Sequence, residues 1–165
     1  MKLTDIIELV KSRAKGLDAD LTPLLDEVKK YLTIGKYLPA SVNFEEPQTI
    51  RQAQKALAVI EARLDRIVSI HHDAKRTLQI LASAEHQLTG ALVTHGELPK
   101  TASGPIQQRC LAAMVPELIR VKTRWQTLDQ ICTQAQQRLA SARDSIKLQS
   151  QLDDNLRWAQ HRNPS

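Results

Sequence analysis

The chain of 165 residues is poor in aromatic side chains, which make up 3% of it, and it contains only 5 glycines. So few aromatic rings argue against a globular core built on them and favour helix-to-helix seams of Leu, Ile and Ala. The glycines and the 7 prolines are clustered, which leaves few turns. No stretch alternates apolar and polar residues in the manner of a half-buried strand. The sequence therefore predicts an all-α fold.

Cysteine and long apolar runs are also scarce. Cys110 and Cys132 are far apart and form no CxxC pair, so they indicate neither a zinc site nor a disulfide framework. The apolar run from Leu3 to Val10 is short and interrupted by charges, unlike a signal peptide. No apolar stretch approaches the roughly 20 residues of a membrane span. We therefore expect a cytoplasmic protein without a membrane partner.

The sequence does contain a long, unbroken heptad pattern from Ile50 to Leu88. Apolar residues recur alternately three and four positions apart, and His71 and Glu85 are the two polar members of this seam. The pattern predicts one helix from about Pro47 to Thr89 that presents a single seam to a partner helix. Polar residues at seam positions often set register or oligomeric state. An alternative role for His71 is that its protonation changes how the seam packs.

A second regular seam runs from Leu111 to Ile146. The segment 90–104 between the two seams is rich in Gly and Pro, so we expect it to form a loop. Two long seams joined by one loop predict an antiparallel helical hairpin, similar to a coiled coil. Pro116 lacks a backbone N–H and clashes with the preceding turn, so we expect a kink or short break near Val115.

We expect residues 1–42 to form a pair of shorter helices and residues 43–165 to form the long hairpin. Gly16 is expected to end the first helix, and Pro23 fits the opening turn of the second. This pair is expected to pack near the open end of the hairpin. Because a hairpin buries only a narrow stripe, we expect other copies of the chain to cover its side faces and form a homo-oligomer.

Catalytic motifs are absent from the sequence. It contains no GxSxG, Walker loop, HExxH or dinucleotide fingerprint. The 5 histidines are scattered without a spacing that would complete a ligand set, and no nucleophile has a plausible base beside it. We therefore expect a non-enzymatic protein without a metal or another cofactor.

The formal net charge of +5 is unevenly distributed. Residues 47–165 carry 16 Lys and Arg against 10 Asp and Glu, whereas residues 1–46 carry 7 against 8. A basic helical body favours an anionic partner, most simply nucleic acid. Pairing with acidic neighbours on a solvated face is the alternative for each basic residue. The candidate DNA-contacting residues are Lys55, Arg63, Arg66, Lys75, Arg76 and Lys147.

A second candidate patch precedes the long helix. Three lysines interleave there with two tyrosines, in the order Lys29, Lys30, Tyr31, Lys36, Tyr37. Proteins that bind single strands combine positive charge along the backbone with aromatic rings that stack on bases. Packing of the two tyrosines against the hairpin is the alternative.

Parts of both long helices resemble the UvsY-type recombination mediators of tailed phages. In the last helix the resemblance rests on Trp125, Cys132, Ala135, Leu139, Ser141, Ile146 and Lys147. In the preceding helix, the segment from Glu61 to Arg66 is similar to the short basic motif, with an Ala-Arg-Leu-Asp core, that the family uses to contact single-stranded DNA. Glu61 departs from that motif, because the family carries a Lys there.

The resemblance implies a ring-shaped homo-oligomer, closed partly by C-terminal helices, that binds single-stranded DNA coated with single-strand-binding protein. It further implies that the protein helps a RecA-like recombinase to nucleate its filament, with Arg63 as a DNA contact. The residues expected to serve assembly are Trp125, Leu128, Leu139, Ile146 and Leu156.

Two other interpretations stay open. The chain could be a structural or adaptor coiled coil, for example an assembly chaperone or scaffold, in which the basic residues only solvate the helices. It could also be a regulator that recognises a host protein through its N-terminal helices.

Overall fold

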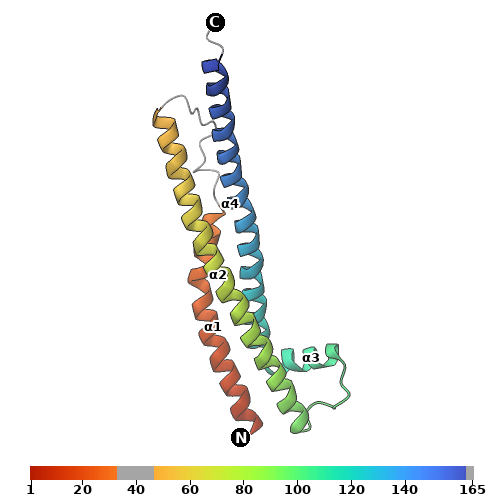
Figure 1. The fold of residues 1–165 in the computed structure, drawn as a ribbon. Helices are drawn as coiled ribbons and strands as arrows, with labels where there is room; N and C mark the ends of the chain where they lie inside the picture. Colours follow the sequence, from red (N-terminus) through yellow and green to blue (C-terminus); the bar gives the residue numbers. More distant parts are fainter. Residues whose placement is uncertain (33–46, 163–165) are drawn as a thin grey trace. The chain divides into compact units, whose positions relative to one another are not determined.

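The computed structural model describes residues 1–32 and 47–162, with the backbone alone at residues 47–52 and at part of 149–156. Four helices account for almost all of these residues (Figure 1): α1 (Leu3–Tyr31), α2 (Pro47–Thr94), α3 (Gly104–Met114) and α4 (Pro116–Arg162). No strand occurs in this part of the chain. The prediction of an all-α fold is confirmed.

The chain divides into two compact units, each of which combines segments that are distant in sequence. Unit 1 contains Met1–Glu27 and Ile70–Ile131, and unit 2 contains Val28–Ser69 and Cys132–Ser165. The expected division between residues 1–42 and 43–165 does not follow these units, and its boundary lies outside the described residues.

Within unit 1, α2 and α4 run antiparallel (Figure 1). His71 of α2 faces Asp129 of α4, and Glu85 faces Lys122, so a later residue of α2 meets an earlier residue of α4. This is the antiparallel direction that a hairpin requires. The expectation of antiparallel long helices is therefore confirmed for this unit.

α1 belongs to unit 1 over most of its length and contacts α4 there. Asp18 of α1 pairs with Arg124 of α4, in the same unit that holds the loop between α2 and α3. The expectation that the N-terminal helices pack near the open end of the hairpin is wrong. A two-helix seam leaves an apolar flank exposed, and in this unit α1 covers that flank with its own apolar stripe.

α1 is one continuous helix of 29 residues and not the expected pair. Its apolar stripe passes Gly16 and Pro23 without interruption, through Leu3, Ile7, Val10, Ala14, Leu17, Leu21, Leu24, Val28 and Tyr31. Ala14, Leu21 and Val28 are buried. A glycine inside a helix costs about 1 kcal/mol and a proline about 3 kcal/mol relative to alanine. Burial of a Leu or Val side chain contributes about 1.5–3 kcal/mol each, which offsets that cost.

The connection from α2 to α4 follows the expected outline. α2 ends at Thr94, five residues beyond the expected Thr89, and the loop turns at Gly96, whose φ of 78° favours glycine. Val115 separates α3 from α4 with φ −137° and ψ 68°. The prediction of a break near Val115 is confirmed, and Pro116 accounts for it because its ring disfavours a helical conformation at the residue before it.

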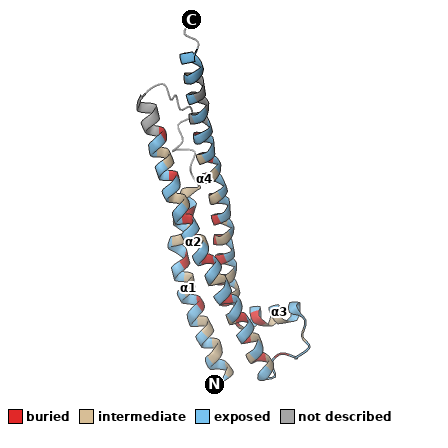
Figure 2. Ribbon diagram, viewed as in Figure 1, coloured by how far each residue is buried: buried red, intermediate tan, exposed pale blue. Residues whose placement is uncertain are grey.

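The core of unit 2 is built from seam positions of α2 and α4 (Figure 2). Ala53, Ile60 and Ile67 of α2 are buried, as are Ala135, Leu139, Ala142 and Ile146 of α4. Among the described side chains of α4 that follow Ile146, none is buried. None of the helices in residues 1–32 and 47–162 combines the length and apolar character that a membrane span requires.

Candidate nucleic-acid interface

The net positive charge of the chain belongs entirely to unit 2. Its residues include 12 Lys and Arg against 7 Asp and Glu, a net charge of +5. Unit 1 carries 11 residues of each sign and is neutral. Unit 2 is therefore the part of the chain whose charge would favour an anionic partner.

Three of the predicted DNA contacts lie close together on α2 in unit 2. Lys55 and Arg66 are eleven residues apart, which is about three helical turns, so they project from the same side of the helix. Both side chains are exposed. Arg63 is one turn before Arg66 and is therefore its neighbour on the helix surface. We call these three residues the basic face.

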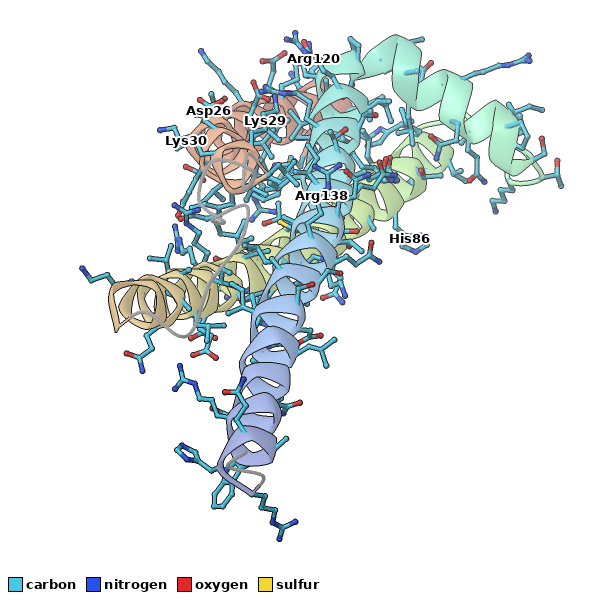
Figure 3. The ribbon with its side chains drawn as sticks, turned by 90° about the horizontal axis from the view of Figure 1, so that it is seen from above. Asp26, Lys29, Lys30, His86, Arg120 and Arg138 are labelled. Atoms are coloured by element: carbon cyan, nitrogen blue, oxygen red, sulfur yellow. The ribbon has the colours of Figure 1, made fainter. Side chains whose placement is uncertain are left out.

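Tyr31 at the end of α1 contacts the basic face. The guanidinium carbon of Arg63 lies 5.3 Å from the centre of the Tyr31 ring, within the range of a cation–π interaction. Lys29 and Lys30 (Figure 3) directly precede Tyr31 in the last turn of α1. Two patches that the sequence suggested separately are thus brought together. Lys36 and Tyr37 of the second patch lie outside the described residues.

Lys147 of α4 lies apart from the basic face and pairs with Glu61. Its ammonium nitrogen is 3.7 Å from the Glu61 carboxylate, and the side chains are 52% and 56% exposed. Such a pair contributes at most about 1 kcal/mol in water. Glu61 is thereby paired with a cation on the opposing helix.

The remaining two predicted contacts, Lys75 and Arg76, belong to unit 1. Both side chains are exposed. They are part of a neutral unit, so the charge distribution adds no support for a role in DNA binding. Their assignment stays a prediction.

Four of the five residues expected to serve assembly are buried inside the protomer. Trp125 and Leu128 lie in the core of unit 1, and Leu139 and Ile146 lie in the core of unit 2. Packing within the chain accounts for their apolar character. The side chain of Leu156 lies outside the described part of α4. An interface between copies would therefore have to use other, exposed residues.

The two polar seam residues of α2 both have charged partners on α4. Glu85 is 8% exposed, and its Oε2 atom accepts a hydrogen bond from Lys122 Nζ at 2.6 Å. His71 Nε2 lies 2.8 Å from Asp129 Oδ1. The seam pattern indicated the two polar positions, but nothing in the sequence identified their partners.

Nothing in the sequence indicated the contacts between α1 and α4. Besides the pair between Asp18 and Arg124, the indole nitrogen of Trp125 donates a hydrogen bond to the carbonyl oxygen of Leu17 at 3.2 Å. This bond satisfies the polar atom of a buried tryptophan. Residues more than 100 positions apart carry no local signal of such a contact, and the expected break at Gly16 concealed the helix that provides it.

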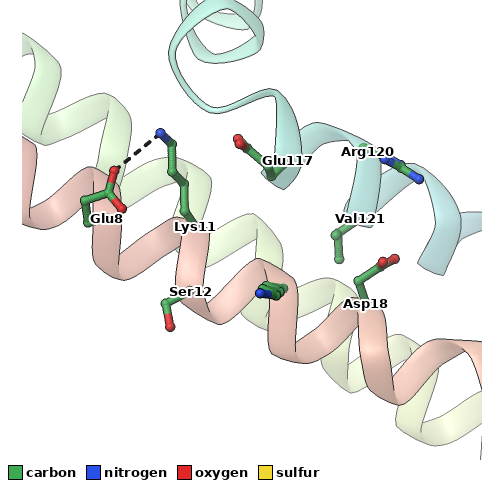
Figure 4. Close-up of a pocket in the computed structure, with 8 residues that line it drawn as sticks. Glu8, Lys11, Ser12, Asp18, Glu117, Arg120 and Val121 are labelled. Atoms are coloured by element: carbon green, nitrogen blue, oxygen red, sulfur yellow. Dashed lines mark hydrogen bonds and ion pairs between the residues drawn. The ribbon is translucent and has the colours of Figure 1, made fainter.

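Unit 1 also contains an open hollow of about 400 Å³ between α1 and α4 (Figure 4). Its charged lining combines three cations with three carboxylates, and Lys11 pairs with Glu8 at 3.4 Å. The balanced charge favours neither an anion nor a cation. The residues that line it are Glu8, Lys11, Ser12, Lys15, Asp18, Glu117, Arg120 and Val121.

The described residues contain no cluster of His, Cys, Asp or Glu side chains that could hold a metal ion. Comparison with protein-family models, with curated proteins and with solved structures gives no match for this chain.

Proposed function

We propose that this chain is a non-enzymatic protein that binds single-stranded DNA through unit 2. The observation that carries this proposal is the separation of charge, because unit 2 holds the whole net charge of +5 and unit 1 holds none. The basic face supplies three of these cations from one helix.

The aromatic ring beside the basic face supports a single strand as the ligand. Bases of a single strand are free to stack on side chains, whereas those of a duplex are paired and stacked on each other. Tyr31 stands next to Arg63, Lys29 and Lys30. A protomer that neutralises about three or four phosphates binds weakly and with strong salt dependence.

The more specific role follows from the resemblance to UvsY-type mediators. In that role the protein binds DNA coated with single-strand-binding protein, weakens the coat and helps a RecA-like recombinase to begin its filament. Assembly of several copies strengthens the interaction, because every contact after the first along one strand becomes intramolecular. The buried residues of α4 do not supply this assembly surface, which we assign to exposed positions.

An adaptor coiled coil without nucleic-acid binding is the second candidate. It is favoured by basic residues that already have acidic neighbours, since Lys147 pairs with Glu61 and Arg143 pairs with Asp144 at 3.1 Å. If this function is correct, the positive charge of unit 2 only keeps the helices soluble. The two candidates differ in whether the protein binds an oligonucleotide.

The test is a titration of a fluorescently labelled single strand with wild-type protein and two double variants. Lys55→Ala with Arg66→Ala removes two exposed cations of the basic face. Lys100→Ala with Arg120→Ala removes two exposed cations of unit 1 and serves as the matched control. The slope of log K against log salt is negative. We expect the first pair of substitutions to reduce its magnitude by about 1.4, and we expect the control pair to leave it unchanged. Equal effects of both pairs would contradict the proposed surface.

A further inference from the structure

The two tryptophans of the chain occupy opposite environments. Trp125 is 2% exposed and its indole nitrogen is hydrogen-bonded within unit 1. Trp158 is 71% exposed near the end of α4. Only 3% of the residues in the chain are aromatic. An exposed tryptophan is therefore unexpected, because burial of its ring would stabilise the fold.

The surroundings of Trp158 are polar. Helical spacing places residues three, four and seven positions away on the same side of α4 as Trp158. The described residues at these positions are Gln151, Asp154, His161 and Arg162, and all four are exposed. Leu148, which is 57% exposed, is ten residues away, about 15 Å along the helix axis, so it is not an immediate neighbour of Trp158.

This pattern does not fit an interface between copies of the chain. A seam between helices needs neighbouring apolar side chains that are buried together. Trp158 is instead a single ring among polar groups, with Asp154 one turn before it and Arg162 one turn after it. A flat ring next to a cation is an arrangement with which proteins hold an unpaired nucleobase and its phosphate.

We propose that Trp158 stacks on a base of single-stranded DNA and that Arg162 and His161 face the adjoining phosphates. This inference rests on the proposed function and adds a second contact region to it. Trp158 belongs to unit 2, which carries the whole net positive charge. The end of α4 thereby becomes a binding element, which explains why no described side chain after Ile146 is buried.

The intrinsic fluorescence of the full chain tests this assignment directly. An oligothymidylate of about 16 nucleotides is long enough to occupy a typical single-strand site. Binding is expected to quench the emission of the exposed Trp158. In Trp158→Phe, only the buried Trp125 emits, so the quenching is expected to disappear while a labelled oligonucleotide still reports binding.

The affinity of two further variants separates stacking from a structural effect. Trp158→Ala is expected to weaken binding about 5- to 150-fold, in line with the contribution of one stacked base. The slope of log K against log salt should stay constant, because no phosphate contact is removed. Leu148→Ala, on the same helix and similarly exposed, is the matched control and is expected to bind as the wild type does.

Three results would overturn the inference. Unchanged binding by Trp158→Ala, with normal salt dependence in the wild type, would reject the stacking contact and leave the proposed function intact. A shift of Trp158 emission with protein concentration in the absence of DNA would place the ring in an interface between copies instead. Failure of the wild type to bind any single strand would reject both the inference and the proposed function.

Discussion

At the scale of single residues, charged side chains fix how α2 and α4 meet in unit 1. Glu85 and His71 interrupt an otherwise apolar seam, and each faces a charged residue of α4. A shift of one heptad would leave the Glu85 carboxylate buried without its partner. Polar seam residues of this kind select one register among several that apolar packing alone would allow.

The pair between Glu85 and Lys122 yields a prediction about stability. Lys122→Met leaves a carboxylate that is 8% exposed without its cation. We expect the free energy of unfolding to fall by about 1–3 kcal/mol, measured by urea denaturation. Adding Glu85→Leu should recover most of this loss, since no buried charge then remains. Lys147→Met, which breaks an exposed pair, is the control and should cost less than about 1 kcal/mol.

Arg63 yields a prediction about binding. Arg63→Ala removes one cation of the basic face and its contact with the Tyr31 ring. We expect weaker binding to a single strand, and we expect the magnitude of the slope of log K against log salt to fall by about 0.7. Arg120→Ala in neutral unit 1 provides the comparison. If the two variants bound equally well, Arg63 would have no part in the interface.

At the scale of elements, the sequence was most informative where the apolar period was long. The seams predicted both α2 and α4, and Pro116 predicted the break at Val115. α1 was divided wrongly because Gly16 and Pro23 were interpreted as boundaries. The stripe from Leu3 to Tyr31 passes both residues, and tertiary burial outweighs the low helix propensity of either one.

The continuous α1 predicts that Gly16→Ala stabilises the protein. Gly16 lies inside the helix, and a Cβ atom there meets nothing within 4 Å. Because alanine loses less conformational entropy than glycine on folding, we expect the free energy of unfolding to rise by about 0.5–1 kcal/mol, measured by thermal unfolding. Gly96→Ala is the matched control, since its φ of 78° strains any side chain and should lower stability. A loss of stability in Gly16→Ala would indicate that the helix ends there.

At the scale of the whole molecule, the sequence indicated a basic body but not how the charge is divided. The excess appeared to belong to residues 47–165. The fold assigns it to unit 2 alone, because residues 70–131, with a net charge of +2, join residues 1–27, with a net charge of −2, in unit 1. This division depends on contacts between segments that are far apart in the chain. Periodicity and composition carry no information about such contacts.

Assembly can be tested on the intact protein. We expect light scattering to give a multiple of the 18.5 kDa chain mass, since the proposed mediator acts as a homo-oligomer. A constant mass of one chain at micromolar concentrations would contradict the assembly. In that case, only weak binding of single-stranded DNA by single protomers would remain of the proposed function.

The most direct test of the central claim is the affinity of the wild-type protein for a single strand at about 50 mM and about 200 mM salt. With about three or four phosphates neutralised by each protomer, we predict that affinity falls about 15- to 50-fold between these conditions. Binding to a duplex of the same length should be weaker at both. An affinity that does not change with salt, or no binding at the lower concentration, would contradict the assignment of unit 2 as a surface for single-stranded DNA.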